Sequence, residues 1–455
     1  MIQTLSRPGP YIAEFERLET RRGGRGGAWL MPLRRAAMAR FAELGFPTTD
    51  QEHWRHTNLA PLAATPFGPA DPDAHPGPEQ LAPLLPAGQA ARLVFVNGRF
   101  APELSDTGSL PEGVLVRDLA PALERPDAPL RAHLARHAAY RDQPLVALNS
   151  ALFEDGALVH VARGVVVERP IHVVFVTTRQ AAPVVTYPRT LIVAEAQSAL
   201  SLVEAFAGLP PPGSQPPGAG AGAYFTNAVT ELVAGENAHV DYCKVQRESA
   251  AAFHLHTLRI SQQCNSTLAA HAVTLGGRLA RTDLHATFDG PGAGAALEGL
   301  ALLAGTQHAD DHLRVEHLQP HCTSREFYKN VLSGQARAVF TGRICVARTA
   351  QKTDAKQTNM NLLLSDAARV DTRPQLEIFA DDVKCTHGAT IGQLDPDALF
   401  YLRSRGLPDG AARQLLIQAF AGEIIDRIPA EALRTQLRRE LAARLPGGAA
   451  PGGAA

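Results

Sequence analysis

The feature that most constrains the fold is a series of short β-type runs that extends from residue 92 to about residue 394. The runs are separated by Gly, Asn, Asp and Pro, as in ALVHVARGVVVERPIHVVFV and FHLHTLRISQQC. Four turn-like breaks that lead into strands, at Ser198, Asn237, Ser266 and Ala295, recur at intervals of 39, 29 and 29 residues. Stacked coils impose a repeat of this length, whereas a β-sandwich has breaks about every 8 to 12 residues. The pattern therefore favours a β-solenoid over a β-sandwich.

Other segments interrupt or precede these strands. Residues 1–65 are interpreted as a helical lead-in, because apolar residues in MPLRRAAMARFAEL recur at helical spacing. Residues 66–91 are too rich in proline to continue a helix and are interpreted as a linker. The Gly/Pro-rich stretch 208–224 is expected to be a surface insertion. The predicted solenoid core therefore spans 92–394.

The C-terminal region, 395–445, returns to a helical pattern. Apolar residues recur every four positions in two series, Leu416, Phe420, Ile424 and Ile428, and then Leu433, Leu437, Leu441 and Leu445. Two interpretations stay open for these helices: an end cap that packs on the body of the protein, or a docking surface for a partner. The tail, 446–455, contains only Gly, Ala and Pro and is expected to be disordered.

Composition narrows the class of protein. Lys plus Arg number 44 against 45 for Asp plus Glu, so the net charge of −1 offers no general attraction to nucleic acid or to an anionic membrane. No run approaches the roughly 18 consecutive apolar residues that a membrane helix needs, and the N-terminus lacks the apolar segment of a secretion signal. The five cysteines are widely spaced without a CxxC pair, which predicts reduced thiols. We therefore expect a cytoplasmic protein.

One short stretch, VKCTHGATIG at 383–392, places a thiol and an imidazole two residues apart in strand-like sequence. Side chains alternate along a strand, so Cys385 and His387 are expected to project from the same face. Together they supply two ligands suited to iron or zinc, which is half of a tetrahedral set. Two interpretations stay open: a buried structural cysteine beside a hydrogen-bonded histidine, or a metal site completed by a distant coil or another chain.

Other polar clusters indicate chemistry less clearly. The segment 307–324 contains five possible metal ligands: His308, His312, His317, His321 and Cys322. His308 and His312 have the spacing of a helical zinc pair, but the HADDH sequence lacks the catalytic glutamate of an HExxH motif. A carbohydrate-cleaving β-helix would use a pair of carboxylates, for which four aspartates are candidates: Asp283, Asp289, Asp310 and Asp311. The sequence contains no phosphate-binding loop or dinucleotide fingerprint, so nucleotide chemistry would belong to a partner.

A longer stretch makes the chain recognisable. Residues 328–406, which contain QTNMNLLLSDAARVDTRPQLEIFADDVKCTHGATIG, resemble the SufB/SufD family of iron–sulfur cluster assembly proteins. GFPTTDQEHW, ALNSALFEDGALVHV and ERPIHVVFV also resemble this family, so the resemblance covers most of the chain. The Cys-x-His-Gly-Ala-Thr pattern at Cys385 and His387 is similar to the SufD branch, whereas the SufB branch tends to have a His-Glu-Ala version. One departure is His56, where the family more often has an aromatic residue.

The resemblance implies a mainly β fold, a right-handed parallel β-helix flanked by helical regions, and a non-catalytic scaffold role in a complex with SufB and the ATPase SufC. A SufB-like partner would bind the β-helix end that carries Cys385 and His387, which would be candidate ligands of a transient cluster shared with that partner. No cofactor is expected to stay bound. A SufC-like ATPase would dock on the C-terminal helices, where the candidate contact residues are Leu399, Tyr401, Arg405, Leu416, Phe420 and Ile424.

Alternative functions stay open at this point. The chain is also compatible with a SufB-like scaffold or with a binding protein that forms a homodimer when alone. A β-helix enzyme that acts on polysaccharides is less favoured, because such a groove uses aromatic stacking platforms and aromatic residues make up only 6% of the chain.

Overall fold

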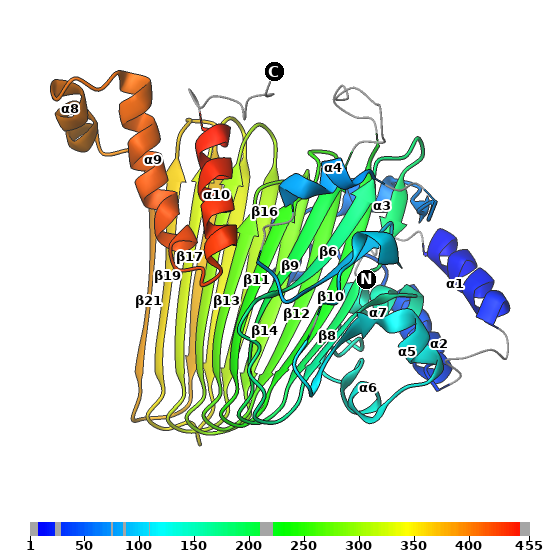
Figure 1. The fold of residues 1–455 in the computed structure, drawn as a ribbon. Coiled ribbons are helices and arrows are strands. Elements are labelled where there is room, and N and C mark those ends of the chain that lie inside the picture. Colours follow the sequence, from blue (N-terminus) through cyan, green and yellow to red (C-terminus); the bar gives the residue numbers. More distant parts are fainter. Residues whose placement is uncertain are drawn as a thin grey trace.

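The computed structural model describes residues 8–22, 29–73, 76–84, 88–108, 110–209 and 222–445. Its centre is a β-solenoid whose coils stack side by side along one axis (Figure 1). The predicted parallel β-helix is therefore confirmed. Most of the stretch expected to be a surface insertion, and the whole tail expected to be disordered, lie outside the described residues.

Two sheets form the walls of the solenoid, and each is named here after its last strand. The β21 sheet contains, in spatial order, β3 (Arg99–Phe100), β2 (Ala91–Val96), β6 (Ile171–Thr178), β9 (Ala199–Leu209), β11 (His239–Arg247), β13 (Thr267–Thr274), β15 (Gly294–Leu303), β17 (Thr323–Leu332), β19 (Asp354–Leu363) and β21 (Lys384–Gly392). The β20 sheet contains β4 (Val114–Asp118), β5 (Gly156–Val161), β8 (Arg189–Ala194), β10 (Tyr224–Ala234), β12 (Ala252–Gln262), β14 (Leu279–Phe288), β16 (His308–His317), β18 (Arg337–Val346) and β20 (Arg369–Ile378), with β7 (Val184–Thr186) and β1 (Gly68–Pro69) beside β10.

The strand register explains the sequence repeat. From β8 onward each coil adds one strand to each sheet, and neighbouring strands pair in parallel. Successive register partners along the β21 sheet are Ala199, His239, Thr267, Gly294, Thr323, Asp354 and Lys384. The first step is longest because residues 208–224 lie within it. The spacing of the four breaks in the sequence therefore predicted the coil repeat. Each break lies one or two residues from the position that the strand register aligns.

The lumen of the solenoid combines an apolar core with buried ionisable groups. Side chains such as Leu202, Phe206 and Leu232 pack inside it. Several fully enclosed polar residues share this interior, namely Glu204, Lys244, Glu248, His254, His256, Asp311 and Glu326. Burial lowers the pKa of Lys244 to about 8 and raises the pKa of Asp311 to about 7, because a low-dielectric interior disfavours the charged form of each.

N-terminal helices cover the outer face of the β20 sheet at its early coils. Apolar residues of this face, including Phe225, Phe253 and Leu255, form one cluster with Phe41 and Leu148 from the helices. These helices are α1 (Gly9–Arg22), α2 (Met31–Leu44), η1 (Glu52–Trp54), α3 (Ala60–Ala64), α5 (Leu119–Glu124), α6 (Ala128–His133) and α7 (Pro144–Leu152). The expectation that strands dominate from residue 92 onward is therefore wrong for 119–152, which is mostly helical and packs with the N-terminal helices.

The segment interpreted as a proline-rich linker packs against the solenoid instead. Pro69 pairs in β1 with Val185 of β7, and Leu81 is buried against Val94 and Val174. Short helical turns shape this segment and the loop after β3: α4 (Pro78–Leu81), η2 (Ala82–Leu84) and η3 (Pro102–Leu104). The proline content prevents a long helix, but apolar residues between the prolines still gain contacts with the sheet.

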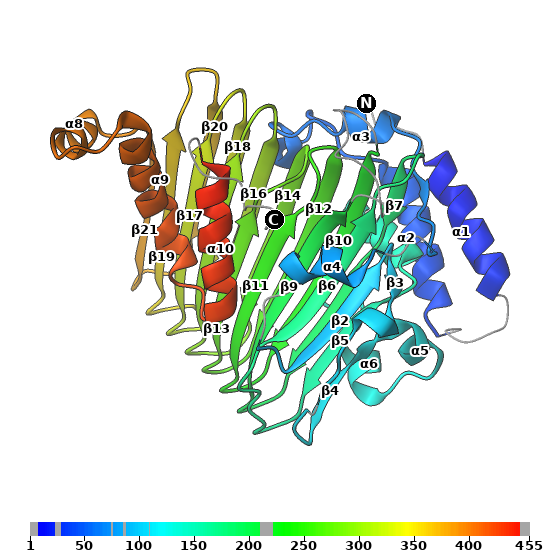
Figure 2. The same ribbon diagram turned by 45° about the horizontal axis from the view of Figure 1, so that its top comes forward.

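The C-terminal helices are α8 (Pro396–Ser404), α9 (Asp409–Ile425) and α10 (Glu431–Arg444). α9 and α10 lie against the outer face of the β21 sheet, and α8 projects from the body beside β21 (Figures 1 and 2). Leu433, Leu437 and Leu441 pack on Cys243 and Val245 of that face. The helices pack on the body of the protein, as the end-cap interpretation expected. They cover a lateral apolar face, however, and not the end of the solenoid. No helix in the described ranges is long and apolar enough to span a bilayer.

A buried ion pair between two strands of the β20 sheet also binds the backbone of the helical layer. The Arg189 guanidinium donates to the Glu231 carboxylate, and both side chains are fully buried. Glu231 also accepts backbone N–H groups of Ala135, His137 and Ala138 at 2.8 to 2.9 Å. Burial by itself would raise the pKa of Glu231, but the arginine and the amides outweigh it and lower the pKa.

We predict that Arg189→Ala lowers the free energy of unfolding by about 3–5 kcal/mol, because it leaves the Glu231 carboxylate buried without its cation. Chemical denaturation followed by circular dichroism measures the change. Arg325→Ala is the matched control, since Arg325 pairs with Asp354 on the surface, where a loss of at most about 1 kcal/mol is expected. Equal losses for the two variants would contradict this assignment.

Candidate functional site at the open end of the solenoid

Among the described residues, no strand pairs with the outer side of the last coil of the solenoid. β20 and β21 each end their sheet, so the outer backbone groups of both strands lack a pairing strand among the described residues. An edge of this kind is a template for another chain unless it is covered or charged. The C-terminal helices lie on the lateral face and do not cover it (Figure 2). The open end is therefore the place where the stacking of coils is incomplete.

Cys385 and His387 lie on this last coil and face the lumen. Cys385 is paired in register with Ala355, and His387 with Gln357, on β19. Both β19 residues are buried inside the solenoid, so the alternation of the strand directs Cys385 and His387 to the interior side of β21. Cys385 is half-buried and packs against the lumen core, whereas His387 is exposed. The expected shared face is thus observed.

The interpretation of the pair as buried structural residues is wrong for His387. No coil lies above it, and its imidazole makes no hydrogen bond to the described residues. For Cys385, burial raises the pKa of the thiol above its ordinary value, with a smaller contribution from Asp354 in the same direction. The thiol therefore stays protonated at neutral pH unless a metal or a cationic group lowers its pKa.

An apolar rim surrounds this end. Ile378 and Phe379 at the end of β20 are 40% and 62% exposed, and Ile391 on β21 is 51% exposed. Leu376, which precedes Ile378 by two residues and lies on the same face of β20, is partly buried against the lumen core. Exposed apolar residues next to unpaired strands are typical of a protein–protein interface, and here they lie near both ends of β21. Sequence reasoning missed this rim, because single apolar residues at a strand end look like ordinary core positions.

A buried polar pair lies beneath His387. The amide nitrogen of Gln357 donates a hydrogen bond to the carboxylate of Glu326, and both side chains are almost completely buried. Burial raises the pKa of Glu326 to about 7, although the hydrogen bond from Gln357 opposes this. Sequence reasoning missed these residues too. The alternation in AKQTNMN, which puts Gln357, Asn359 and Asn361 on the face of buried Ala355, is the signal that could have found the polar stripe.

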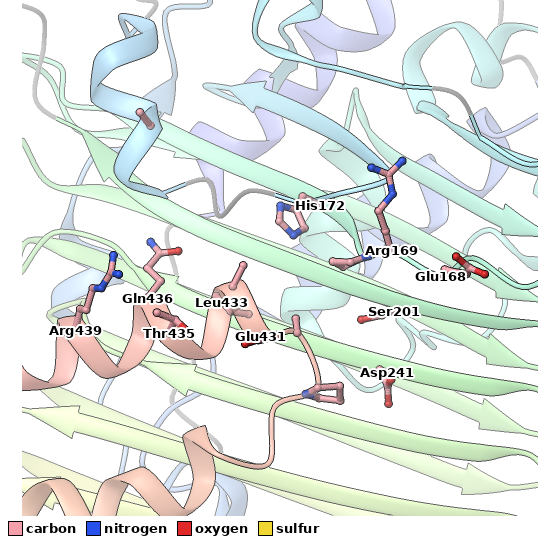
Figure 3. Close-up of a pocket in the computed structure, with 16 residues that line it drawn as sticks. Glu168, Arg169, His172, Ser201, Asp241, Glu431, Leu433, Thr435, Gln436 and Arg439 are labelled. Atoms are coloured by element: carbon pink, nitrogen blue, oxygen red, sulfur yellow. The ribbon is translucent and has the colours of Figure 1, made fainter.

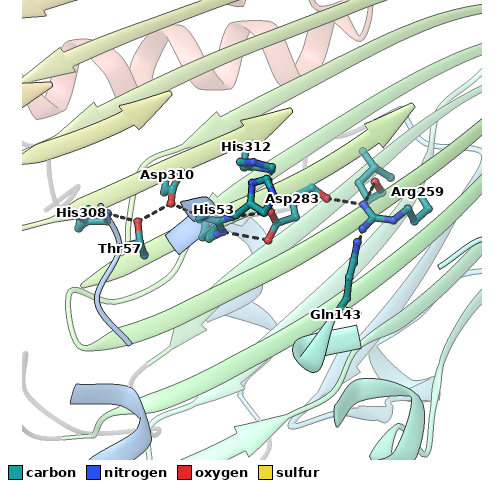
Figure 4. A network of polar contacts seen from close by, with 10 residues as sticks. His53, Thr57, Gln143, Arg259, Asp283, His308, Asp310 and His312 are labelled. Carbon is teal, nitrogen blue, oxygen red and sulfur yellow. Dashed lines mark hydrogen bonds and ion pairs between the residues drawn. The ribbon is translucent and has the colours of Figure 1, made fainter. Parts of the chain in front are cut away.

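Four of the other candidates, Asp283, His308, Asp310 and His312, belong to one polar network, and Asp311 lies apart from it. Asp283 pairs with Arg281 at 2.8 Å and with His312 at 3.3 Å on the outer face of the β20 sheet (Figure 4). Burial would raise the pKa of Asp283, but the Arg281 guanidinium outweighs it and holds the pKa well below its usual range. Asp310 also pairs with Arg281, whereas Asp311 is fully buried in the lumen. Asp283 and Asp310 therefore share the outer face, but both are ion-paired with the same arginine, and Asp311 lies on the other face of the sheet.

The outer network has a structural task that involves the N-terminal segment. Arg281 donates to the backbone oxygen of His53 at 3.0 Å, and its guanidinium lies 3.9 Å from the centre of the Trp54 ring. Thr57 donates to Asp310 and lies 3.0 Å from the Nε2 atom of His308 (Figure 4). These contacts hold the segment that contains Trp54 on the β20 sheet.

The remaining histidines predicted as candidates are dispersed. His317 is buried in the lumen and lies 3.0 Å from the Ser324 hydroxyl, while His321 occupies an exposed turn. Cys322 is buried and donates to the backbone oxygen of Gly290 at 3.4 Å. Within the described ranges, no group of three or more His, Cys, Asp or Glu side chains is arranged to hold a metal ion. Cys385 and His387 thus offer an incomplete ligand set.

A separate groove lies between the start of α10 and the β21 sheet (Figure 3). It has a volume of about 950 Å³ and is lined by charges of both signs, Arg169, Arg439, Glu168, Asp241 and Glu431. Burial lowers the pKa of His172 in its wall to about 4. The mixed charges do not select one class of ion.

The predicted docking residues of the C-terminal helices differ in accessibility. Tyr401 is 58% exposed on α8, with the guanidinium of Arg405 5.2 Å from its ring centre. Leu399 and Leu416 are partly buried. Phe420 is partly buried beside the Lys329 ammonium. Ile424 is fully buried on the side of α9 that packs on the sheet. In this conformation Ile424 therefore packs on the solenoid and is not accessible to a partner.

Comparison with known proteins decides the family. The model of the SufBD core domain, described as part of SUF system FeS cluster assembly, matches residues 175–420. The SufBD protein N-terminal region matches residues 11–173. The chain belongs to the SufBD family. This membership gives it a role in iron–sulfur cluster assembly.

Similarity to individual members indicates the SufD type. The chain is 36% identical to an iron–sulfur cluster assembly SufBD family protein of Synechocystis over 423 residues, 91% of each chain. It is 34% identical to the iron–sulfur cluster assembly protein SufD of Escherichia coli over 410 residues, which cover 89% of this chain and 90% of that protein. Its identity with SufB of Bacillus subtilis is 25% over 324 residues, 70% of this chain and 66% of that one. The predicted resemblance to SufD is confirmed.

We predict that Cys385 is alkylated by iodoacetamide with a pH midpoint above that of the same cysteine in the urea-unfolded chain, because burial raises the pKa of its thiol. An unperturbed cysteine has a pKa of about 8.5. Peptide-level mass spectrometry across pH 7 to 10.5 measures both midpoints, with the unfolded chain as the control. A folded-state midpoint at or below the unfolded one would contradict the burial of the thiol.

Proposed function

We propose that this protein is a non-catalytic scaffold subunit that binds a SufB-type partner at the open end of its solenoid. The observation that carries the proposal is the uncovered last coil. Cys385 and His387 lie on the lumen side of its strand β21, and no further coil of the described chain stacks over them. The SufBD family membership supports it. A partner that covers this end would complete the strand stacking, bury the apolar rim and bring further ligands to the two side chains. We expect this assembly to work in the cytoplasm.

The proposed chemistry requires only ordinary ligand behaviour. An iron–sulfur cluster is the cargo of the assembly, and iron in such clusters is held by thiolates and by neutral imidazoles. His387 would supply an imidazole from this chain, and the partner would supply the thiolates. Cys385 would become a ligand or a sulfur acceptor once metal lowers its pKa. Because the site is incomplete in one chain, no cofactor would stay bound to the isolated protein.

We further propose that α8 is the principal docking element for a SufC-type ATPase. Phe400 is 72% exposed and Tyr401 58%, on a helix that projects away from the body (Figure 1). Exposed aromatic residues of this kind are typical anchors of protein interfaces. Sequence reasoning named Tyr401 and missed Phe400, because its apolar character fitted a packed helix equally well.

Contacts of α9 would carry a movement of the docked ATPase into the solenoid. The buried ammonium of Lys329 on β17 donates to the Phe420 carbonyl oxygen at 3.0 Å and to the Glu423 carboxylate on α9. On the opposite face of β17, Glu326 contacts Gln357 inside the lumen. One strand therefore connects the helices of the proposed ATPase contact to the layer beneath His387.

The alternatives predict other observations. A homodimer would use the same open end, so it would compete with a SufB-type partner and would appear only when the chain is alone. A polysaccharide-cleaving enzyme would need one carboxyl that can donate a proton beside a second carboxylate, whereas the two candidate acids that converge, Asp283 and Asp310, are both ion-paired with Arg281. The scaffold function is the one that the open end favours.

We predict that His387→Ala still assembles with the SufB-type and SufC-type partners but loses at least about ten-fold in the rate of cluster building. The reason is that the change removes one iron ligand without affecting the apolar rim. Co-purification measures assembly, and absorbance at the cluster bands during reconstitution measures the rate. His239→Ala, an exposed histidine on β11, is the control. Full activity of the His387 variant would refute the ligand role.

We predict that the double variant Phe400→Ala, Tyr401→Ala weakens binding of the SufC-type ATPase by about ten-fold or more while the SufB-type partner stays bound. Loss of exposed aromatic anchors typically costs more than about 1 kcal/mol each at an interface. Isothermal titration calorimetry with each partner measures the two affinities. Val166→Ala, which removes an exposed apolar side chain elsewhere, is the control. An unchanged ATPase affinity would place the docking site off α8.

A further inference from the structure

The hydrogen-bond pattern beneath His387 is one-sided. Gln357 on β19 donates through its amide nitrogen to Glu326 on β17, the strand one coil further in. At pH 8, above the pKa of about 7 that burial gives Glu326, the carboxylate is ionised and only accepts hydrogen bonds, so the nitrogen is the end of the amide that faces it. The amide oxygen, Oε1, has no hydrogen-bond partner among the described residues, and it is buried. A buried acceptor without a donor is unfavourable, so this oxygen can gain free energy from a donor on the neighbouring coil.

Packing holds the Gln357 side chain in place. It reaches across the lumen to Gly342 on β18, where a Cβ atom would lie only 2.1 Å from the amide nitrogen and 2.8 Å from the amide oxygen. Glycine at this position therefore leaves the space that the amide fills. With the nitrogen bound to Glu326 on the inner coil, the oxygen is the amide atom that can still accept a donor, and the next coil is the last one. The residue of the last coil in register with Gln357 is His387.

We propose that Gln357 is a positioning residue for His387: when a partner covers the open end, the imidazole turns onto the lumen and donates one N–H to the Gln357 oxygen. This inference rests on the proposed function, because the covering partner is part of it. Glu326 holds the amide, the amide holds the imidazole, and the second imidazole nitrogen is left without a proton. The chain Glu326, Gln357 and His387 thus has the order carboxylate, amide, ligand.

The chemical consequence is a choice of tautomer. A neutral imidazole carries its proton on either nitrogen, and only the unprotonated nitrogen binds a metal. A hydrogen bond from one N–H to a fixed acceptor selects that tautomer and orients the ring, which is how outer groups tune metal-bound histidines. In the isolated chain His387 is exposed and lacks this bond, so we expect both tautomers there. Covering the end would then convert an unselective imidazole into an oriented ligand.

The test reads the tautomer directly. The complex with the SufB-type partner and the isolated chain are prepared with ¹⁵N-labelled histidine and compared by magic-angle-spinning NMR at pH 8, without iron. The His387 signals are assigned by their loss in His387→Gln. We expect a tautomer mixture in the isolated chain and a single tautomer in the complex. The same mixture in both samples would overturn the proposal.

Two variants separate positioning from folding. Gln357→Met keeps the side-chain volume but removes the acceptor, so the complex should return to a tautomer mixture and cluster building should slow by about 10–100-fold, as for other outer-sphere changes. Glu326→Gln is the conservative control, because its amide oxygen still accepts from Gln357 and should preserve the single tautomer. A single tautomer in both variants would overturn the role of Gln357, even if Gln357→Met were less stable.

The same measurements keep this inference distinct from the proposed function. The tautomer is read without a cluster, whereas the ligand role of His387 is read from cluster building by His387→Ala. A single tautomer combined with full activity of His387→Ala would support the positioning contact and refute the ligand role. A mixture in the wild-type complex combined with loss of activity in His387→Ala would support the ligand and overturn the contact.

Discussion

The parallel stacking of coils is the constraint on which the rest of this structure depends. A coil satisfies its backbone groups and buries its inward side chains only through the coils on either side. Every interior coil has two such neighbours, whereas the coil of β20 and β21 has one. Exposure of Cys385 and His387 is therefore a result of their place in the stack. The same residues one coil further in would be enclosed, as Ala355 and Gln357 are.

The flanking helices determine which surfaces remain for partners. The outer faces of both sheets carry apolar residues, and the N-terminal and C-terminal helices cover them. Polar contacts hold each layer: Glu231, which is paired with Arg189 of the same sheet, accepts backbone N–H groups of the segment after α6, and Lys329 of β17 pairs with Glu423 of α9. Among the exposed large apolar residues of the described chain, several lie at the open end and on the projecting α8.

The lumen is more polar than coil stacking requires. Burying ionisable groups costs free energy unless they are hydrogen-bonded, and Glu204 meets this condition through Thr190, Thr230 and Tyr242. Glu326 and Gln357 meet it incompletely, since each keeps one oxygen without a partner among the described residues. That deficit lies directly beneath the open end.

The sequence by itself determined the solenoid, the shared face of Cys385 and His387, and the family, because a coil repeat, strand alternation and a long signature are all local patterns. It could not place the helices at 119–152 or the lateral position of α9 and α10, since amphipathic stripes do not say which apolar face they cover. Nor could it tell that His387 is uncovered while Gln357 is enclosed. Only the tertiary structure decided this, because burial in a solenoid depends on the number of neighbouring coils, which no single strand encodes.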